Sequence, residues 1–444
     1  MENLNLEKNA GKVWNPFMQM KTYLDYSPQI LQSVDQDNYF TNAKGDRLYD
    51  GMSTMLNTNV GHCNPEIIKA IDEQLNQLDN TTMLTSTSDI AIKCSKKLCS
   101  LTDNHFYATF FTNSGSESCD TAIKIIRKYW KNKGVEKNGI VSLKWAYHGA
   151  TIGGMMLAGD WFEPDDYGLS RKGFYQISCP DPLDYEGIPM EEVMKQCIQE
   201  FESLVKKHRN EIGAIFMELI QLSNAANVLP IPYVQEMARI CERENILLVF
   251  DEVATGFGRT GTMFSYQQYG VKSDLMMIAK GITSGYIPMG GVLATEEVYK
   301  TFWGEKEELC FTHGYTTGGH PVACAAALSN IKIIEERSLP YNAGKMGCYL
   351  MNKIIASCGE SKLIMDVRGK GLMISIIFHD VKISGMEQLG IAYAFTKLLS
   401  AKGLLLYPKD VDILILAPPL TIEQKECDMI VETLKDCINE IKLL

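Results

Sequence analysis

The sequence lacks any apolar run of the length that a membrane span requires, about 20 residues. Its opening residues, MENLNLEKNAGK, are polar and lack the apolar core of a signal peptide. Basic residues are not in excess either: the formal net charge is −11, which argues against a general nucleic-acid or anionic-membrane surface. We therefore expect a cytoplasmic protein that has small-molecule partners and binds neither nucleic acid nor a membrane.

Cysteine motifs are lacking as well. The thirteen cysteines are scattered, without a CxxC pair and without a Cys/His cluster at metal-ligand spacing. Such an odd, scattered set indicates reduced thiols rather than a disulfide framework or a zinc site, so we expect no metal. The 45% hydrophobic and 22% charged residues are ordinary for a soluble globular protein, and 444 residues favour two domains.

The most informative stretch is residues 273–291, SDLMMIAKGITSGYIPMGG, where an apolar run ends in Lys280 and opens a glycine-rich loop. The run LMMIA is short and bounded by turn residues, which predicts a buried strand with Lys280 at its carboxyl end. Desolvation lowers the pKa of a lysine, and a neutral amine is what a Schiff base with an aldehyde cofactor requires. A strand that ends in a solvated lysine is nevertheless the commoner case.

A second apolar run, ILLVF at residues 246–250, ends in Asp251 and Glu252. If the two strands are parallel neighbours, Asp251 and Lys280 lie on one edge of the sheet, where open α/β sheets bind ligands. These two groups suit pyridoxal phosphate, because the lysine holds the aldehyde as an imine and the acid pairs with the ring nitrogen. A simple Asp–Lys ion pair explains the same pattern about as well.

A phosphate site is indicated by TFFTNSGS at residues 109–116, which predicts a strand, a tight turn and the start of a helix. A helix N-terminus presents free N–H groups and a positive dipole end to an anion. Gly115 lets the backbone approach such a ligand closely, and Ser116 adds a hydroxyl. An ordinary capped helix is the alternative interpretation.

Two further strand ends carry polar side chains: Tyr147 with His148, and Glu218. An aromatic ring at such a position can stack on a flat cofactor, although Tyr147 and His148 are equally explained as interior residues. His148 has no partner at metal-ligand spacing. The proline-rich and aspartate-rich residues 160–189 predict a surface excursion of the kind that often covers an active site.

The order of elements predicts an α/β protein: a mostly parallel sheet flanked by helices, followed by a smaller α+β domain. Residues 1–60 form an N-terminal arm that packs with the small domain. The large, cofactor-binding domain spans residues 61–330, and the small C-terminal domain spans residues 331–444.

Several motifs follow one another along the chain: TNSGSES at 112–118, YHG at 147–149, DEVATGFGRTG at 251–261, AKG at 279–281 with the tail SGYIPMGG, HGYT at 313–316, GHP at 319–321, VRGKG at 367–371 and APPL at 417–420. Together they resemble the class III pyridoxal-phosphate aminotransferases over nearly the whole chain. The resemblance implies fold type I and pyridoxal 5'-phosphate as cofactor. It also implies a ping-pong transfer of an amino group from an amine or amino acid to a keto acid, ketone or aldehyde.

The resemblance further implies the role of each cofactor residue. Lys280 would hold the cofactor aldehyde as an imine and then move a proton between the substrate carbon and the cofactor. Asp251 would pair with the pyridinium nitrogen, with Glu218 close by. Val253 would pack on one face of the ring and Tyr147 on the other.

Gly115 and Ser116 would hold the phosphate, according to the same resemblance. Thr316 would reach the phosphate of the neighbouring subunit, which makes the active unit a homodimer with shared sites. The expected substrate-binding residues are Phe17, Leu56, Tyr147 and Tyr407.

The opening WNPF and the SGYIPMGG tail are similar to the branch that contains omega-transaminases and diaminopelargonate synthases. A diaminopelargonate synthase usually has a tyrosine at Phe17, a tryptophan pair at Met55 and Leu56, and an aspartate at Ala150. Without those polar groups a diamine loses partners, and an unpaired polar group in a buried site costs about 1–3 kcal/mol. That substrate therefore ranks second.

Many relatives carry an arginine at the position of Tyr407, where it clamps a substrate carboxylate. Tyrosine offers one hydroxyl in place of a charged bidentate fork. Either another cation, from the arm or from Arg259, binds the carboxylate, or the main amino donor has none near the reacting carbon.

Other class III activities stay open, because an aminomutase, a racemase or a decarboxylase would share Lys280, Asp251 and the phosphate loop. An inactive scaffold is disfavoured because the lysine is retained. The loop after Gln221 departs from the family, since Leu222, Asn224 and Ala225 stand where glycines are expected. Its shape is not predicted.

Overall fold

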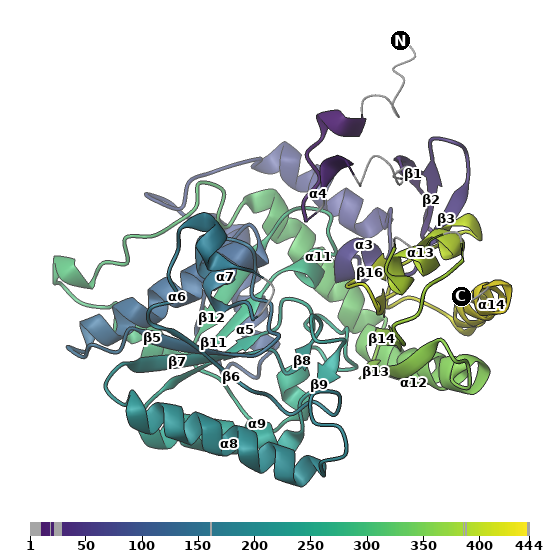
Figure 1. Ribbon diagram of the computed structural model, residues 1–444. Helices are drawn as coiled ribbons and strands as arrows, with labels where there is room; N and C mark the ends of the chain where they lie inside the picture. The colour runs from purple at the N-terminus through teal and green to yellow at the C-terminus, as the bar shows by residue number, and fades with distance from the viewer. Residues whose placement is uncertain are drawn as a thin grey trace.

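The computed structural model describes residues 10–17, 19–21, 29–159, 162–384, 386 and 389–441. The predicted arm and the predicted excursion at 160–189 lie partly outside these residues. Figure 1 shows a larger body built around a sheet and a smaller body that contains both the first strands and the last helices of the chain. None of the helices in the described part of the chain has the length and apolar character of a membrane span.

The larger body is built on a seven-stranded sheet in which β12 alone runs against the other strands. The prediction of a mostly parallel α/β sheet is therefore confirmed. In spatial order the strands are β4 (Ala108–Thr112), β12 (Gly290–Ala294), β11 (Leu275–Ile278), β10 (Leu247–Asp251), β7 (Ile212–Met217), β5 (Gly139–Leu143) and β6 (Phe174–Ile177).

The reversed strand β12 corrects the interpretation of the SGYIPMGG tail, whose end was expected to be loop. Its first residue, Gly290, is packed so closely that a Cβ there would lie 2.6 Å from Thr112 Oγ1 and 2.7 Å from the Ser114 carbonyl oxygen. The glycine pair permits this close strand contact, which a pattern of glycines alone does not distinguish from a flexible turn.

Helices cover both faces of the sheet, because alternate residues of each central strand point to opposite sides. Leu247 and Val249 of β10 pack in one buried cluster with side chains of α6 (Gly115–Asn132). Leu248 and Phe250 point into the other, larger cluster. The helices that contribute to this second cluster include α4 (Pro65–Gln77), α5 (Asp89–Ser100), α8 (Met190–Lys207), α9 (Ile231–Glu244) and α11 (Pro321–Glu336).

The smaller body contains two four-stranded sheets. One has the order β13 (Ile364–Lys370), β14 (Met373–Phe378), β17 (Ile413–Leu416), β16 (Tyr407–Pro408). The other has the order β1 (Leu31–Val34), β2 (Tyr39–Asn42), β3 (Arg47–Asp50), β15 (Leu404–Leu405), so strands from the two ends of the chain share one sheet. Its helices are α12 (Leu339–Cys358), α13 (Ile391–Ala401) and α14 (Gln424–Glu440). The boundaries of the predicted domains stay a prediction.

Short elements complete the described chain. They are the hairpin β8 (Ile220–Gln221) and β9 (Asn227–Val228), the helices α3 (Ser53–Leu56), α7 (Ile152–Leu157) and α10 (Glu296–Lys300), and the 3-10 turns η1 (Ala10–Lys12), η2 (Pro164–Tyr167), η3 (Ser265–Gln268), η4 (Lys280–Ile282) and η5 (Glu307–Leu309).

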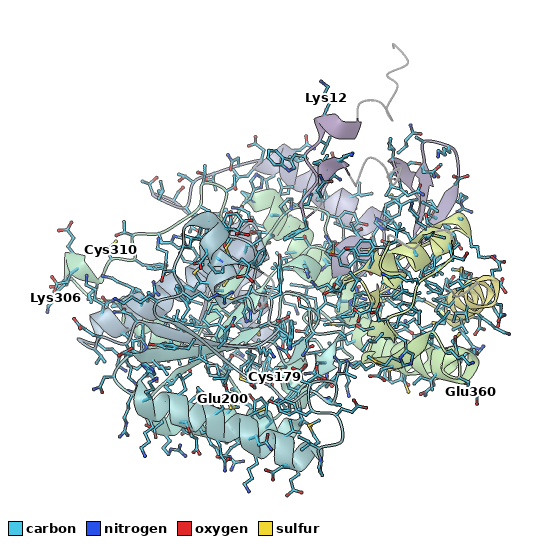
Figure 2. The ribbon with its side chains drawn as sticks, viewed as in Figure 1. Lys12, Cys179, Glu200, Lys306, Cys310 and Glu360 are labelled. Atoms are coloured by element: carbon cyan, nitrogen blue, oxygen red, sulfur yellow. The ribbon has the colours of Figure 1, made fainter. Side chains whose placement is uncertain are left out.

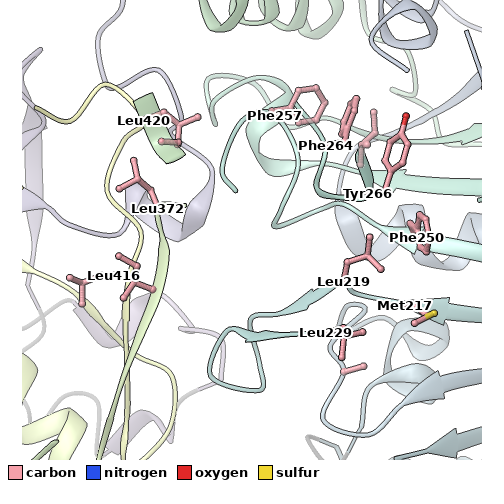
Figure 3. Packing of buried hydrophobic residues seen from close by; sticks show 14 of the residues in the cluster. Met217, Leu219, Leu229, Phe250, Phe257, Phe264, Tyr266, Leu372, Leu416 and Leu420 are labelled. Atoms are coloured by element: carbon pink, nitrogen blue, oxygen red, sulfur yellow. The ribbon is translucent and has the colours of Figure 1, made fainter. Parts of the chain in front are cut away.

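The larger buried cluster extends from one body into the other. Figure 3 shows part of it, from Phe250 of the large sheet to Leu416 of the small one. Charged side chains such as Lys306 and Glu360 lie at the periphery, whereas Cys179 lies inside (Figure 2). The two bodies thus share apolar packing, which gives the elements around the sheet edge a continuous support.

Arg259 joins the two bodies by hydrogen bonds within this interior. Its side chain is fully buried and donates to four oxygens: the carbonyls of Leu372 (3.0 Å) and Pro418 (2.6 Å), Ser53 Oγ (3.1 Å) and Asn59 Oδ1 (2.8 Å). Burial lowers the pKa of its guanidinium to about 9, and the charge of Asp50 opposes that fall.

We predict that Arg259→Lys lowers the free energy of unfolding by roughly 2–4 kcal/mol, because one ammonium cannot serve four fixed acceptors and each buried acceptor left unpaired is costly. Calorimetric unfolding of both proteins measures the effect. Arg239→Lys is the matched control, since Arg239 is exposed and pairs only with Glu236 at the surface. Equal midpoints for wild type and Arg259→Lys would contradict the structural role.

Candidate active site

A cavity of about 360 Å³ opens at the carboxyl edge of the large sheet. β10 and β11 are parallel neighbours, with Asp251 opposite Met277, so Asp251 and Lys280 reach this edge from adjacent strands. The expected juxtaposition of the acid and the lysine is therefore present. The predicted site residues that line the cavity are Gly115, Ser116, Tyr147, Glu218, Asp251, Val253 and Lys280.

The remaining predicted site residues, Thr316, Phe17, Leu56 and Tyr407, do not line this cavity in the described part of the chain. Thr316 is exposed. Phe17 is 69% exposed, and its ring centroid lies 6.3 Å from that of Phe162. The Phe162 ring in turn lies 6.3 Å from the ring of Tyr147, so Phe17 is connected to the cavity only through a second aromatic side chain.

Leu56 and Tyr407 belong to a small apolar cluster beside the cavity. Leu56 is buried there together with Ile415 of β17, and Tyr407 and Leu222 pack against the same cluster. Leu222 also lines the cavity, so this cluster forms the support behind one wall.

The N-terminus of α6 forms another wall. Ser114 caps the helix, and Gly115 and Ser116 begin it. A Cβ at Gly115 would lie only 2.8 Å from Val253 Cγ1, so this position favours glycine. Ser116 Oγ accepts a hydrogen bond from the N–H of Ala150 at 3.1 Å, which leaves its hydroxyl hydrogen for a ligand. The arrangement presents backbone N–H groups and a positive dipole end to an anion.

Asp251 is held by a histidine. His148 Nδ1 lies 2.7 Å from Asp251 Oδ2, and both side chains are buried. Burial by itself lowers the pKa of His148, but the hydrogen bond and charge of Asp251 raise it overall. With its proton on Nδ1, His148 donates to the carboxylate and keeps it in one orientation.

His148 was not among the predicted site residues. It directly follows Tyr147 after β5, in the same sheet as β10, so the argument from strand ends applies to it as well. Its other ring nitrogen, Nε2, has no hydrogen-bond partner among the described residues.

Glu218 lies on the same side of the cavity as Tyr147. Its Oε2 accepts the N–H of Tyr147 at 2.8 Å. Burial raises the pKa of Glu218 to about 7; the charge of His148 opposes this rise and that of Asp251 adds to it. Burial likewise lowers the pKa of the Lys280 ammonium, although Asp251 and Glu218 oppose that change. The site therefore holds a lysine whose neutral form is favoured beside two carboxyl groups.

Other cavity residues come from segments that sequence analysis did not connect. The tail after Lys280 contributes Thr283 and Met289 to the cavity lining. Their place within the glycine-rich motif that follows Lys280 is the sequence feature that could have indicated them. Asn57, Leu222 and Ser223 come from distant loops and had no comparable signal. Arg259, one possible carboxylate ligand, does not line the cavity, because its side chain is buried in the interior and both of its Nη atoms are bound there.

The loop after Gln221 keeps a glycine-like backbone without glycine. Ala225 and Ala226 have φ angles of 47° and 52°, in the left-handed region. Arg368 stabilises this conformation by donating to the carbonyl of Ala225 at 2.9 Å and to Asp181 Oδ1 at 2.6 Å. The loop thereby brings Ser223 to the cavity despite the strain that alanine carries there.

We predict that the stability of Glu218→Gln against unfolding increases, relative to that of wild type, as the pH rises from about 5 to about 7.5. The pKa of Glu218 is raised from 4.5 to about 7, so the folded state binds the proton more tightly than the unfolded chain. The stabilisation from that proton is complete below pH 4.5 and is lost as the pH rises through about 7. Glutamine does not titrate and avoids this loss.

Thermal midpoints of the protein without added cofactor, measured across this pH range, test the prediction. The exposed Glu186→Gln is the control and should leave a constant difference from wild type. A difference for Glu218→Gln that does not change with pH would show that the group is not held in this way.

Comparison with known proteins shows which family has this fold and cavity. The family model described as aminotransferase class-III matches residues 25–438. The chain is 33% identical over 446 residues to an adenosylmethionine-8-amino-7-oxononanoate aminotransferase of Anoxybacillus flavithermus, covering 98% of this chain and 96% of the relative. It is 32% identical over 379 residues to a beta-alanine–pyruvate aminotransferase of Pseudomonas aeruginosa, covering 82% of each.

Solved structures agree with the sequence relatives. An (S)-enantioselective omega-transaminase from Thermomicrobium roseum superposes with a TM-score of 0.90, at 32% identity and 98% coverage of each chain. An amine transaminase from an uncultivated Pseudomonas species, solved in its PLP-bound form, also gives a TM-score of 0.90, at 29% identity, covering 97% of this chain and 99% of that one.

The residues at the cavity fit pyridoxal phosphate. A helix N-terminus with a glycine that permits close approach suits the phosphate, the fixed carboxylate of Asp251 suits a protonated ring nitrogen, and Lys280 suits the aldehyde. Since the family model spans residues 25–438 and the fold and cavity agree with it, the chain belongs to the class III aminotransferases, enzymes that use pyridoxal phosphate as cofactor.

Proposed function

We propose that the protein catalyses a ping-pong transamination, from an amine or amino-acid donor to a keto acid, ketone or aldehyde, with Lys280 as the catalytic base. The observation that carries the proposal is the opening of Lys280, Asp251 and the α6 N-terminus onto one cavity. When bound there, pyridoxal phosphate supplies an aldehyde that accepts the amino group and a ring that takes up electrons. In a ping-pong reaction the donor product leaves before the acceptor binds, so one cavity serves both half-reactions.

Lys280 moves the proton in both half-reactions. Its Nζ takes the proton from the reacting carbon of the donor and returns a proton to the acceptor carbon. Burial supports this role, because it lowers the pKa of the ammonium and so increases the fraction of neutral amine. Glu218 and Asp251 oppose that shift, which keeps the protonated amine accessible for the return step.

Asp251 and its neighbours orient the cofactor. Asp251 Oδ1 accepts the N–H of Val253 at 3.0 Å while Oδ2 pairs with His148, so the carboxylate has little freedom to rotate. A carboxylate fixed in this way favours the protonated state of the ring nitrogen. Val253 and Tyr147 line the cavity and would contact the two faces of the ring.

The phosphate is held by the N–H groups of Gly115 and Ser116 and by the Ser116 hydroxyl. Thr316 binds the phosphate of the partner subunit in a homodimer of the cytoplasm. Its exposure supports this arrangement, as do large exposed apolar side chains that a second subunit would cover. These are Trp14 (88% exposed), Leu84 (91%) and Trp303 (70%).

Simple amines are the proposed donors, with diaminopelargonate synthesis as the second candidate. The structural likeness to proteins described as omega-transaminases supports the first. Several relatives named as adenosylmethionine-8-amino-7-oxononanoate aminotransferases support the second. The absence of the polar groups that diaminopelargonate synthases usually have at positions 17, 56 and 150 also favours the first, although Phe17 and Leu56 do not themselves line the cavity.

We predict that Lys280→Ala abolishes covalent attachment of the cofactor. Wild-type protein is incubated with pyridoxal phosphate, reduced with sodium borohydride and digested, and mass spectrometry then locates the modified lysine. The modified peptide should contain Lys280 in wild type and in the control Lys272→Ala, whose lysine is exposed. Modification of a different lysine in wild type would remove Lys280 from its proposed role.

The donor class is tested by comparing two substrate pairs: 1-phenylethylamine with pyruvate, and adenosylmethionine with 8-amino-7-oxononanoate. We expect a turnover at least about tenfold higher for the first pair, because each missing polar partner of the diamine corresponds to about 1–3 kcal/mol. A higher turnover for the second pair would make diaminopelargonate synthesis the function.

A further inference from the structure

A substrate carboxylate in this cavity needs a cation that the lining does not supply. Among the described lining residues, Lys280 is the only lysine or arginine, and the proposed function commits it to the cofactor. The cavity also contains the carboxyl groups of Glu218 and Asp251, which would repel a second anion. Arg259 is unable to help, because its side chain is fully buried and both of its Nη atoms are bound in the interior.

The smaller body also contains strand β16, labelled in Figure 1, which pairs with β17 and is followed directly by Lys409. Tyr407 pairs with Ile415, and the N–H of Lys409 continues the ladder by donating to the carbonyl of Ile413 at 2.8 Å. Residues two apart in an extended strand point to the same side, so Lys409 and Tyr407 share one face of the hairpin.

That face lies beside the cavity wall. Tyr407 packs against the small apolar cluster that also supports Leu222 of the cavity wall. Burial, followed by the charge of Tyr407, raises the pKa of the Tyr147 phenol, and Tyr147 lines the cavity. Lys409 extends from the same face and is partly buried.

The charges that act on Lys409 include two cavity groups. Burial lowers its pKa to about 8, Asp410 and Glu218 oppose that change, and Lys280 adds to it. Glu218 and Lys280 both line the cavity, so the ammonium of Lys409 lies within electrostatic reach of the reacting groups.

We propose that Lys409 Nζ binds the carboxylate of keto-acid and amino-acid substrates. In many relatives a bidentate arginine at the position of Tyr407 has this role. The inference rests on the proposed transamination and adds the residue that selects carboxylate substrates. Lys409 lies two residues after Tyr407 on the same strand face, so its long side chain is able to reach back toward the cavity. The hydroxyl of Tyr407 alone would be a weak partner for an anion.

The test compares pyruvate with its neutral methyl ester as amino acceptors for the holoenzyme. Lys409→Met should raise the KM for pyruvate about tenfold or more while kcat changes little, because a hydrogen bond to a charged group is lost. The KM for methyl pyruvate should stay within about twofold. Lys409→Arg should keep the wild-type KM for pyruvate. The control Lys402→Met, which removes an exposed lysine paired with Glu440, should change the KM for neither acceptor.

The pH dependence provides a second readout. In wild type, the ratio of kcat/KM for pyruvate to that for methyl pyruvate should fall above pH 8, as the Lys409 ammonium loses its proton. The ratio cancels ionisations that affect both acceptors equally. In Lys409→Arg the ratio should stay level, because a guanidinium keeps its proton in this range.

The proposal would be overturned if Lys409→Met and Lys409→Arg lost kcat/KM equally with both acceptors. It would also be overturned if Lys409→Met lost kcat/KM with neither acceptor. If wild type aminates neither acceptor, the proposed transamination fails instead, and calorimetric binding of pyruvate to the holoenzyme still tests Lys409. Binding to wild type that is lost in Lys409→Met supports the role; equal binding, or none to either protein, refutes it.

Discussion

The burial of opposite charges at one edge of a parallel sheet is the constraint on which this structure depends. Asp251, Glu218 and Lys280 are removed from water together, and each charge then needs a fixed partner. His148 provides one for Asp251, and the N–H of Tyr147 provides one for Glu218. Because burial raises the pKa of Glu218 and lowers that of Lys280, the same burial that is costly for stability prepares a lysine for proton transfer.

The second body of the protein supports that edge. Arg259 hydrogen-bonds segments of both bodies, and Arg368 holds the strained alanine loop that brings Ser223 to the cavity. A buried arginine serves here as a rigid connector with several donors rather than as a ligand for substrate. The β16–β17 hairpin belongs to this second body, so the residues proposed to select substrates come from a different sheet from those that hold the cofactor.

Most of the cofactor site could be predicted, because it depends on local patterns: an apolar strand, a polar residue at its carboxyl end and a glycine turn before a helix. Gly115, Asp251 and Lys280 follow such patterns, and all three line the cavity. His148 was missed as a ligand of Asp251, since the pairing depends on β5 and β10 lying in one sheet with β7 between them. Strand β12 was missed because its glycines permit close packing as readily as they permit a turn.

The sequence by itself determined the α/β class and the direction of the central strands, which follow from periodicity, and its motifs indicated the chemistry of the cofactor site through their resemblance to the class III aminotransferases. Only the tertiary structure decided which side chains surround the cavity and which lie behind its walls. It showed that Arg259 is bound in the interior, placed Tyr407 behind the cavity wall and placed Lys409 where the charges of Glu218 and Lys280 act on it. Such long-range placement depends on packing between distant segments, which no local pattern encodes.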